Sequence, residues 1–277
     1  NNMIDISSID SLSAKEGANI KQKISRGGKT MLIARKKLLK MIELTGKNGK
    51  YLPILESVLL EQKNGNLCFQ WTNLSETIEI NEPIEGNGNR ILAVPLKILK
   101  ESVQMLKEDE INIDIDDNLG RVKVSDGKIE STIKNCFPAE EFPVLPKKIE
   151  TEEEEVKTSI FLEGLKKVLF AQSTDTIRSN LYGVCIEFAE RDLTFTATTG
   201  QHLANWTLPI RLSEHQFQFI LPSQGIGMLL KLLARGSHVK IRRSKEFVQF
   251  ELDNVLETFH LDDLSFPKWR DLVSVDG

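Results

Sequence analysis

The sequence contains few of the residues from which disulfide frameworks and many active sites are built. Its 277 residues include three cysteines, four histidines and two tyrosines, and aromatic residues make up 6% of the chain. Cys68, Cys136 and Cys185 lie far apart with no C-x-x-C spacing, which argues against a disulfide framework and fits a reducing cytosol. We therefore expect a cytoplasmic protein.

Motifs typical of catalysis and metal binding are also missing. The histidines show no H-x-x-H or H-E-x-x-H spacing, and no phosphate-loop, dinucleotide-binding or G-x-S-x-G segment follows an expected strand. "SRGGKT" (25–30) lacks the first glycine of a phosphate loop and any preceding strand. "IDIDDN" (113–118) places acids in alternation on a strand, from which a two-metal site could start, but a charged turn is the simpler interpretation. We expect a protein that is not an enzyme, without catalytic residues, metal or cofactor.

Long apolar runs and an excess of positive charge are absent as well. The longest apolar runs are far too short to span a bilayer, and the first residues lack an apolar signal segment, so we expect no membrane partner. Hydrophobic residues make up 40% of the chain and charged residues 27%, an ordinary soluble composition. The net charge of −4 does not point to nucleic acid, although a basic face can exist within an acidic protein.

The most informative feature that is present is an internal repeat. "YLPILESVLLEQKNGNLCFQWTNLS" (51–75) aligns with "IRSNLYGVCIEFAERDLTFTATTGQ" (177–201) at one constant spacing, and each half later reaches a Phe-Pro step. A repeat of this length indicates one domain that occurs twice. We expect a flexible N-terminal extension at 1–30, a first domain at 31–146, a solvated acidic linker at 147–157 and a second domain at 158–277.

Each half combines amphipathic helices with alternating strands. "ARKKLLKMIELTG" and "PLKILKESVQMLK" in the first half, and "FLEGLKKVLFAQS" and "PSQGIGMLLKLLARG" in the second, carry an apolar stripe. Strand patterns such as "NLCFQWT" and "DLTFTAT" fill the remainder. This predicts an α+β fold in which two helices of each domain pack on antiparallel sheets.

On the face away from the apolar stripe, basic residues outnumber acidic ones in all four expected helices. Such a face is ordinarily the solvated side of an amphipathic helix, and a duplicated domain repeats its surface. The acidic residues gather elsewhere, in the loops and the linker. Basic helices and acidic loops in one chain are nevertheless what a protein needs to hold DNA on one face.

Several segments resemble the bacterial β sliding clamp, the beta subunit of DNA polymerase III. The resemblance lies in "LPILESVLLEQKNGNLCFQWTNLS", "VPLKILKESVQML", "FPAEEFP", "STDTIRSNLYGVCIEFAERDLTFTATTGQHLA" and "LSFPKWRDLV", and it runs from about Met31 to Val273. It implies the DNA clamp fold and a homo-oligomeric ring that encircles double-stranded DNA, independently of sequence. The ring would tether the polymerase and the clamp loader through short peptide motifs and would have no catalytic activity.

The resemblance implies two sets of site residues. The helix faces would line the DNA channel through Lys36, Lys37, Lys40, Lys97, Lys100, Lys167, Arg178, Lys231 and Arg235. Partner peptides would enter a pocket formed by Leu181, Thr198, Gly200, Gln201, His202, Leu203, Pro267 and Leu272. Physically, the second set describes an apolar groove bordered by polar turn atoms. Without the family, Leu181 and Leu203 would read as ordinary core residues.

Some positions depart from the family pattern. Gln201 and His202 replace part of its Asp-Gly-His-Arg-Leu turn, and Asp271 stands where arginine is common. Thr132 and Lys134 occupy positions where the family tends to place apolar interface residues. The family subunit has three domains and this chain spans two, so it is expected to be either a fragment or a two-domain clamp. The alternative function is a clamp-like interaction module that forms no ring and binds clamp-partner peptides or another clamp subunit.

Overall fold

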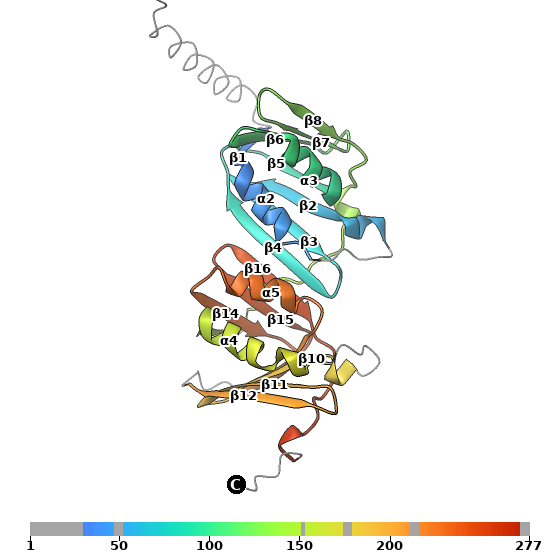
Figure 1. The fold of residues 1–277 in the computed structure, drawn as a ribbon. Helices are drawn as coiled ribbons and strands as arrows, with labels where there is room; N and C mark the ends of the chain where they lie inside the picture. Colours follow the sequence, from blue (N-terminus) through green and yellow to red (C-terminus); the bar gives the residue numbers. More distant parts are fainter. Residues whose placement is uncertain (1–29, 47–51, 151–152, 174–178, 211–215, 272–277) are drawn as a thin grey trace, which may run out of the picture. The chain divides into compact units, whose positions relative to one another are not determined.

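The computed structural model describes residues 30–46, 52–150, 153–173, 179–210 and 216–271 (Figure 1). The chain forms two compact units. The first unit contains most of the chain up to Pro143, and the second contains Val144 onward together with Thr72–Glu79. The expected extension at 1–30 lies outside the described residues except for Thr30, which begins a strand.

The first part of the chain, up to Pro143, contains eight strands and two α-helices among its described residues. In chain order they are β1 (Thr30–Ala34), α2 (Arg35–Glu43), β2 (Ser57–Lys63), β3 (Asn66–Thr72), β4 (Glu76–Pro83), β5 (Asn89–Pro95), α3 (Leu96–Met105), β6 (Glu110–Asp116), β7 (Arg121–Ser125) and β8 (Glu130–Ile133).

The second part repeats this order. It consists of β9 (Glu154–Lys157), α4 (Thr158–Val168), β10 (Gly183–Phe188), β11 (Asp192–Thr198), β12 (Leu203–Pro209), β13 (Phe217–Pro222), α5 (Ile226–Leu233), β14 (His238–Arg243), β15 (Phe247–Leu252) and β16 (Val255–His260). Short 3-10 turns follow α4 at Leu169–Ala171 (η3) and close the described chain at Trp269–Asp271 (η5).

Sheet topology confirms that one α+β design occurs twice. In the first half the strand orders are β1-β6-β7-β8 and β5-β2-β3-β4, and in the second half the corresponding orders are β9-β14-β15-β16 and β13-β10-β11-β12. The pairings within these sheets are antiparallel, as in β10 with β11 and β14 with β15. In Figure 1, α2 and α3 lie side by side on one face of the first unit, and α4 and α5 lie on one face of the second.

An aromatic cluster beneath α4 forms much of the core of the second unit. The ring of Phe161 on α4 meets Phe195 edge-on with 5.1 Å between centroids, and it meets Phe250 at 5.6 Å. All three side chains are fully buried, and each such pair contributes about 0.5–1.5 kcal/mol beyond the burial of its area. Gly164 lies directly over Phe195, and a Cβ there would come within 2.4 Å of the ring. The helix can approach the sheet closely because this position is glycine.

The structure contains strands that the sequence patterns did not reveal. β1 and β9 each precede the first helix of a half. β1 has five residues and pairs with β6, which is far away in sequence, in a register that places Met31 opposite Ile113. β9 has four residues and pairs with the distant β14. Both strands are defined by their distant partners, because they are too short for alternation to stand out.

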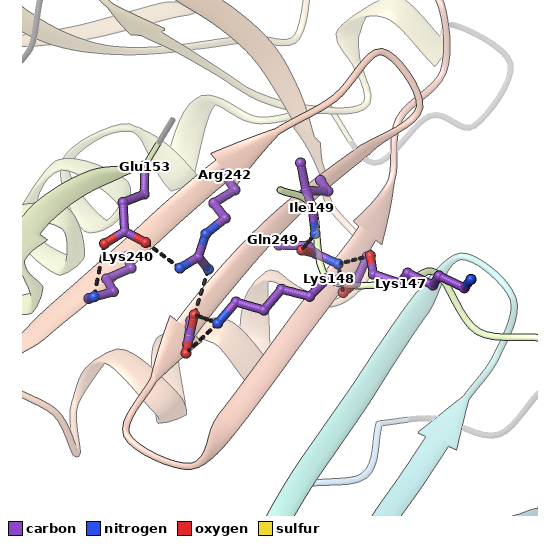
Figure 2. Close-up of polar contacts among 9 residues, drawn as sticks. Lys147, Lys148, Ile149, Glu153, Lys240, Arg242 and Gln249 are labelled. Carbon is purple, nitrogen blue, oxygen red and sulfur yellow. Dashed lines mark hydrogen bonds and ion pairs between the residues drawn. The ribbon is translucent and has the colours of Figure 1, made fainter. Parts of the chain in front are cut away.

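The described residues of the stretch expected to be a solvated acidic linker, 147–150 and 153–157, are bound within the second unit instead. Its last four residues form β9, which pairs with β14, and Glu154 and Val156 are buried. Upstream, the side-chain amide of Gln249 donates to the carbonyl of Lys147 (3.0 Å) and accepts from the backbone N–H of Ile149 (2.7 Å) (Figure 2). The run of glutamates therefore does not make this stretch free in solvent.

A chain of ion pairs holds the acidic stretch at a second point (Figure 2). The buried guanidinium of Arg242 on β14 donates both to Glu153 and to Glu251, the latter at 2.5 Å. Lys240 binds Glu153 at 2.8 Å and Lys148 binds Glu251 at 2.8 Å. The hydrogen bond from Lys240, together with the charge of Arg242, lowers the pKa of Glu153. At Glu251, burial raises the pKa, but the hydrogen bonds from Lys148 and Arg242 outweigh it, so the pKa of Glu251 is lowered as well.

No helix among the described residues is both long enough and apolar enough to pass through a bilayer.

Candidate functional site

The helix pair of each unit presents its basic side chains to solvent. Buried Leu38, Met41 and Ile42 anchor α2, and buried Leu99 and Val103 anchor α3, so each helix turns one face to the core. The lysines and the arginine on the other face are exposed, namely Lys36, Lys37, Lys40, Lys97, Lys100, Lys167, Lys231 and Arg235. The apolar stripe thus decides which cations reach solvent.

The exposed cations differ in whether they have acidic partners. Lys37 pairs with Glu82, and Lys36 lies 4.0 Å from Asp109. No ion pair with a described residue is found for six others, which are Lys40, Lys97, Lys100, Lys167, Lys231 and Arg235. These six can bind a phosphate without first losing an internal partner. Arg178 lies outside the described residues.

The local structure of α5 explains how Lys231 is positioned. Gly225 precedes the helix with φ of +91°, and a Cβ there would come within 2.4 Å of the buried Phe259 ring. Both the left-handed backbone and the close approach require glycine. From this start, Met228, Leu229 and Leu232 turn inward and Lys231 turns to solvent.

Two of the three acids of "IDIDDN" have structural partners. Asp116 binds the guanidinium of Arg121 at 3.2 Å and accepts the backbone N–H of Leu119. Asp117 pairs with Arg90 at 3.3 Å. Among the described residues, no group of three or more histidine, cysteine, aspartate or glutamate side chains is arranged to hold a metal ion.

The Gly200 turn connects β11 to β12 and is closed by threonine side chains. The hydroxyl of Thr198 donates to the carbonyl of His202 (2.7 Å) and accepts from the N–H of Gly200 (3.0 Å). Thr199 accepts from the N–H groups of Gln201 and His202. Gly200 has φ of +89°, a conformation that glycine adopts at little cost. The turn is therefore well ordered, and it leaves the Gln201 and His202 side chains exposed.

The members of the expected peptide pocket are only partly brought together. Thr198 and Leu203 are opposite one another in the β11–β12 register, and Leu181 is buried. Pro267 lines a cavity of about 260 Å³ whose other wall includes Cys185 and Glu187 of β10. The cavity is lined by Cys185, Glu187, Gln218, Phe266, Pro267, Lys268, Trp269, Arg270 and Asp271. It therefore contains one of the eight expected residues, and Leu272 lies outside the described residues.

A clasp that the sequence patterns did not indicate forms one side of this cavity. Glu187 accepts a hydrogen bond from Arg270 (2.9 Å) and another from the Trp269 indole N–H (3.4 Å). The Arg270 guanidinium also lies over the Trp269 ring, 4.4 Å from its centroid. The bond to Glu187 raises the pKa of Arg270, and burial raises the pKa of Cys185 to about 12. The clasp holds η5 against β10, where it places Asp271 on the cavity wall.

Comparison with known proteins shows a similarity to beta sliding clamps. A family model described as the DNA polymerase III beta subunit, central domain, matches residues 155–268. The beta sliding clamp of Buchnera aphidicola is 25% identical over 248 residues, which cover 86% of this chain and 65% of the relative. The clamp of Chlamydia pneumoniae is 24% identical over 87% of this chain and 65% of the relative. This chain is a homologue of the beta sliding clamp.

Solved structures agree on the fold. The DNA polymerase III beta subunit of Pseudomonas aeruginosa superposes with a TM-score of 0.83 at 24% identity, covering 90% of this chain and 69% of that one. The sliding clamp of Caulobacter crescentus also gives 0.83, at 22% identity. The DNA clamp fold is thereby confirmed. The chain spans about two thirds of the length of the curated clamps it matches, and its second half corresponds to their central domain.

Proposed function

We propose that this chain is a DNA sliding clamp subunit that holds duplex DNA against its helix faces, tethers a polymerase and other peptide-motif partners, and performs no chemistry itself. The observation that carries the proposal is that each of helices α2 to α5 carries exposed cations that form no ion pair with a described residue. They are Lys40, Lys97, Lys100, Lys166, Lys167, Lys231 and, directly after α5, Arg235. A homologue of the beta sliding clamp that places unpaired positive charge on all four helices is suited to a sequence-independent phosphate contact.

The exposed cations of the helices differ from several basic residues elsewhere in having no acidic partner among the described residues. Many basic residues outside the helices are already neutralised, such as Arg90 by Asp117, Lys123 by Glu130 and Arg242 by two glutamates. DNA phosphates that contact such a region would have to compete with the carboxylates for these basic side chains. DNA phosphates that contact Lys100 or Lys231 would displace only bound counterions, and the release of counterions drives phosphate binding.

Retention on circular DNA tests the clamp function. The protein, with a clamp loader and ATP supplied, should remain on nicked circular DNA during gel filtration and should be released when the circle is linearised. Charge reversal of Lys40, Lys100 and Lys231 to glutamate should abolish retention, and reversal of the exposed Lys245, which lies in the β14–β15 turn and not on a helix, should not. Equal retention on circular and linear DNA would contradict encirclement.

The second candidate is an interaction module that does not form a ring. The observation that favours it is the polar edge strand β8, where Thr132 is exposed beside the buried Ile133, with the exposed Lys134 directly after the strand. Light scattering during size exclusion separates the candidates. A closed oligomer at micromolar concentration supports the clamp, and a strict monomer that still binds clamp-partner peptides supports the module.

A further inference from the structure

An exposed phenylalanine follows α4 in the turn that ends the helix. Phe170 lies in the 3-10 turn Leu169–Ala171 and exposes 80% of its surface. Its neighbours Val168 and Ala171 are buried, and the N–H of Gln172 closes the turn onto the carbonyl of Leu169 at 3.2 Å. The turn is thus anchored by buried side chains on both sides of Phe170. A rotation of the turn that buried the Phe170 ring would expose Val168 or Ala171.

Two lysines share this end of the helix. Lys166 and Lys167 are exposed, and neither forms an ion pair with a described residue. They precede Phe170 by four and three residues, the spacings that place side chains on one face of a helical turn. The chain therefore carries an exposed apolar ring within about one turn of two exposed lysines that have no ion pair with a described residue.

The chemistry of this patch selects among possible ligands. An apolar partner surface would cover Phe170 but would also desolvate the lysines without compensating their charge. Duplex DNA would satisfy the lysines through its phosphates, but its base faces are stacked inside the helix. An unpaired strand offers both phosphates and free base faces, the combination that single-strand binding proteins recognise with cations and aromatic rings.

We propose that Lys166, Lys167 and Phe170 form a stacking site for an unpaired DNA strand, with a base lying on the Phe170 ring and adjacent phosphates on the two lysines. The site rests on the proposed function, since it assumes that the helix face meets DNA. It adds a preference for single-stranded segments, such as those at a primer–template junction, that cations alone do not provide.

Fluorescence anisotropy with labelled oligo(dT), and with a duplex of the same length, tests this site. Phe170→Ala should weaken oligo(dT) binding about 5- to 150-fold, the equivalent of ~1–3 kcal/mol for one stacked base, and should leave duplex affinity within about twofold. Phe170→Trp should retain oligo(dT) binding, whereas Phe170→Leu, which is apolar but has no π face, should not. The double change Lys166→Ala and Lys167→Ala should weaken binding of both probes.

A matched control is available in the first unit. Leu119, in the turn between β6 and β7, is 63% exposed and adjoins acidic residues, so Leu119→Ala should alter neither affinity. Wild-type affinity for oligo(dT) in Phe170→Ala or Phe170→Leu would overturn the stacking site while the clamp proposal stands on duplex binding. Failure of the wild-type protein to bind either probe would overturn both. Self-association that Phe170→Ala abolishes, with DNA binding unchanged, would assign the ring to a second copy and overturn the site.

Discussion

The carboxyl groups of Glu76 and Glu257 interact inside the second unit, where Glu257 is fully buried and Glu76 is 3% exposed. No N–H or hydroxyl donor of a described residue reaches Oε1 of Glu76 or either carboxyl oxygen of Glu257. Two buried carboxyl groups that interact without such donors do not both ionise, so one of them holds a proton. Burial raises the pKa of both, and the charge of Glu76 raises the pKa of Glu257 further, so the proton belongs to Glu257.

We predict that these two carboxyl groups stabilise the folded protein and that their contribution to the free energy of unfolding decreases as pH rises. Because the folded state raises the pKa of Glu257 above its ordinary value of 4.5, the folded protein binds that proton more tightly than the unfolded chain does. The contribution is complete below pH 4.5 and is lost as pH rises through the raised pKa. Glu257→Gln removes the titration, so its free energy of unfolding relative to wild type should increase by ~1–3 kcal/mol between acidic and mildly alkaline pH.

Urea denaturation at several pH values measures this difference. Glu163→Gln, at an exposed position on α4, is the matched control and should show a difference from wild type that does not vary with pH. A pH-independent difference for Glu257→Gln as well would show that Glu257 does not hold a proton in the folded protein.

We predict that the ion pairs of Arg242 stabilise the attachment of the segment before β9. It is buried and bridges Glu153 to Glu251, so Arg242→Ala leaves two carboxylates without their shared partner (Figure 2). Each glutamate is partly exposed and keeps a lysine, which limits the expected loss in the free energy of unfolding to ~1–3 kcal/mol. The next residue, Arg243, is exposed, and its change to alanine should cost less than about 0.5 kcal/mol. Equal losses for the two variants would argue against the ion-pair network.

The helices of this fold and its repeated design could be predicted from the sequence. The four helices follow from apolar stripes such as Leu96, Leu99 and Val103, because helical periodicity is contained within a few turns. The repeated design follows from the internal repeat, and the basic helix faces follow from both. Each of these signals can be read without knowing which distant residues meet.

The parts that the sequence did not predict depend on distant partners. The glutamates before β9 resemble a solvated charge run, and only the fold brings Arg242, 89 residues beyond Glu153, into contact with them. Gln249 binds the carbonyl of Lys147 across 102 residues in the same way. The clasp of Glu187 with Arg270 spans 83 residues, and it was missed for the same reason. Phe170 belongs to the quoted helix pattern, but its exposure shows only once its buried neighbours are known.

Two of the three cysteines, Cys136 and Cys185, should react slowly in the folded protein. Burial raises the pKa of Cys185 to about 12 and that of Cys136 to about 11, and alkylation proceeds through the thiolate. At mildly alkaline pH, iodoacetamide should therefore modify both at least about a hundredfold more slowly than in the urea-unfolded chain, with Cys185 the slower of the two. Mass spectrometry of peptides from a time course gives both rates. Rapid labelling of Cys185 under native conditions would indicate that the β10 face is open.

The salt dependence of duplex binding should reveal which lysines contact phosphates. Each contact to B-DNA contributes about −0.9 to the slope of log Kobs against log salt concentration. The double variants Lys40→Ala with Lys100→Ala, and Lys231→Ala with Arg235→Ala, should each make the slope less negative by ~1.8 if both cations contact phosphate. Lys245→Ala is the control, because Lys245 is exposed in the β14–β15 turn and lies 3.6 Å from Asp263, so the slope should be unchanged. A slope that responds to Lys245 as strongly as to the helix cations would mean that DNA contacts a face other than α2 to α5.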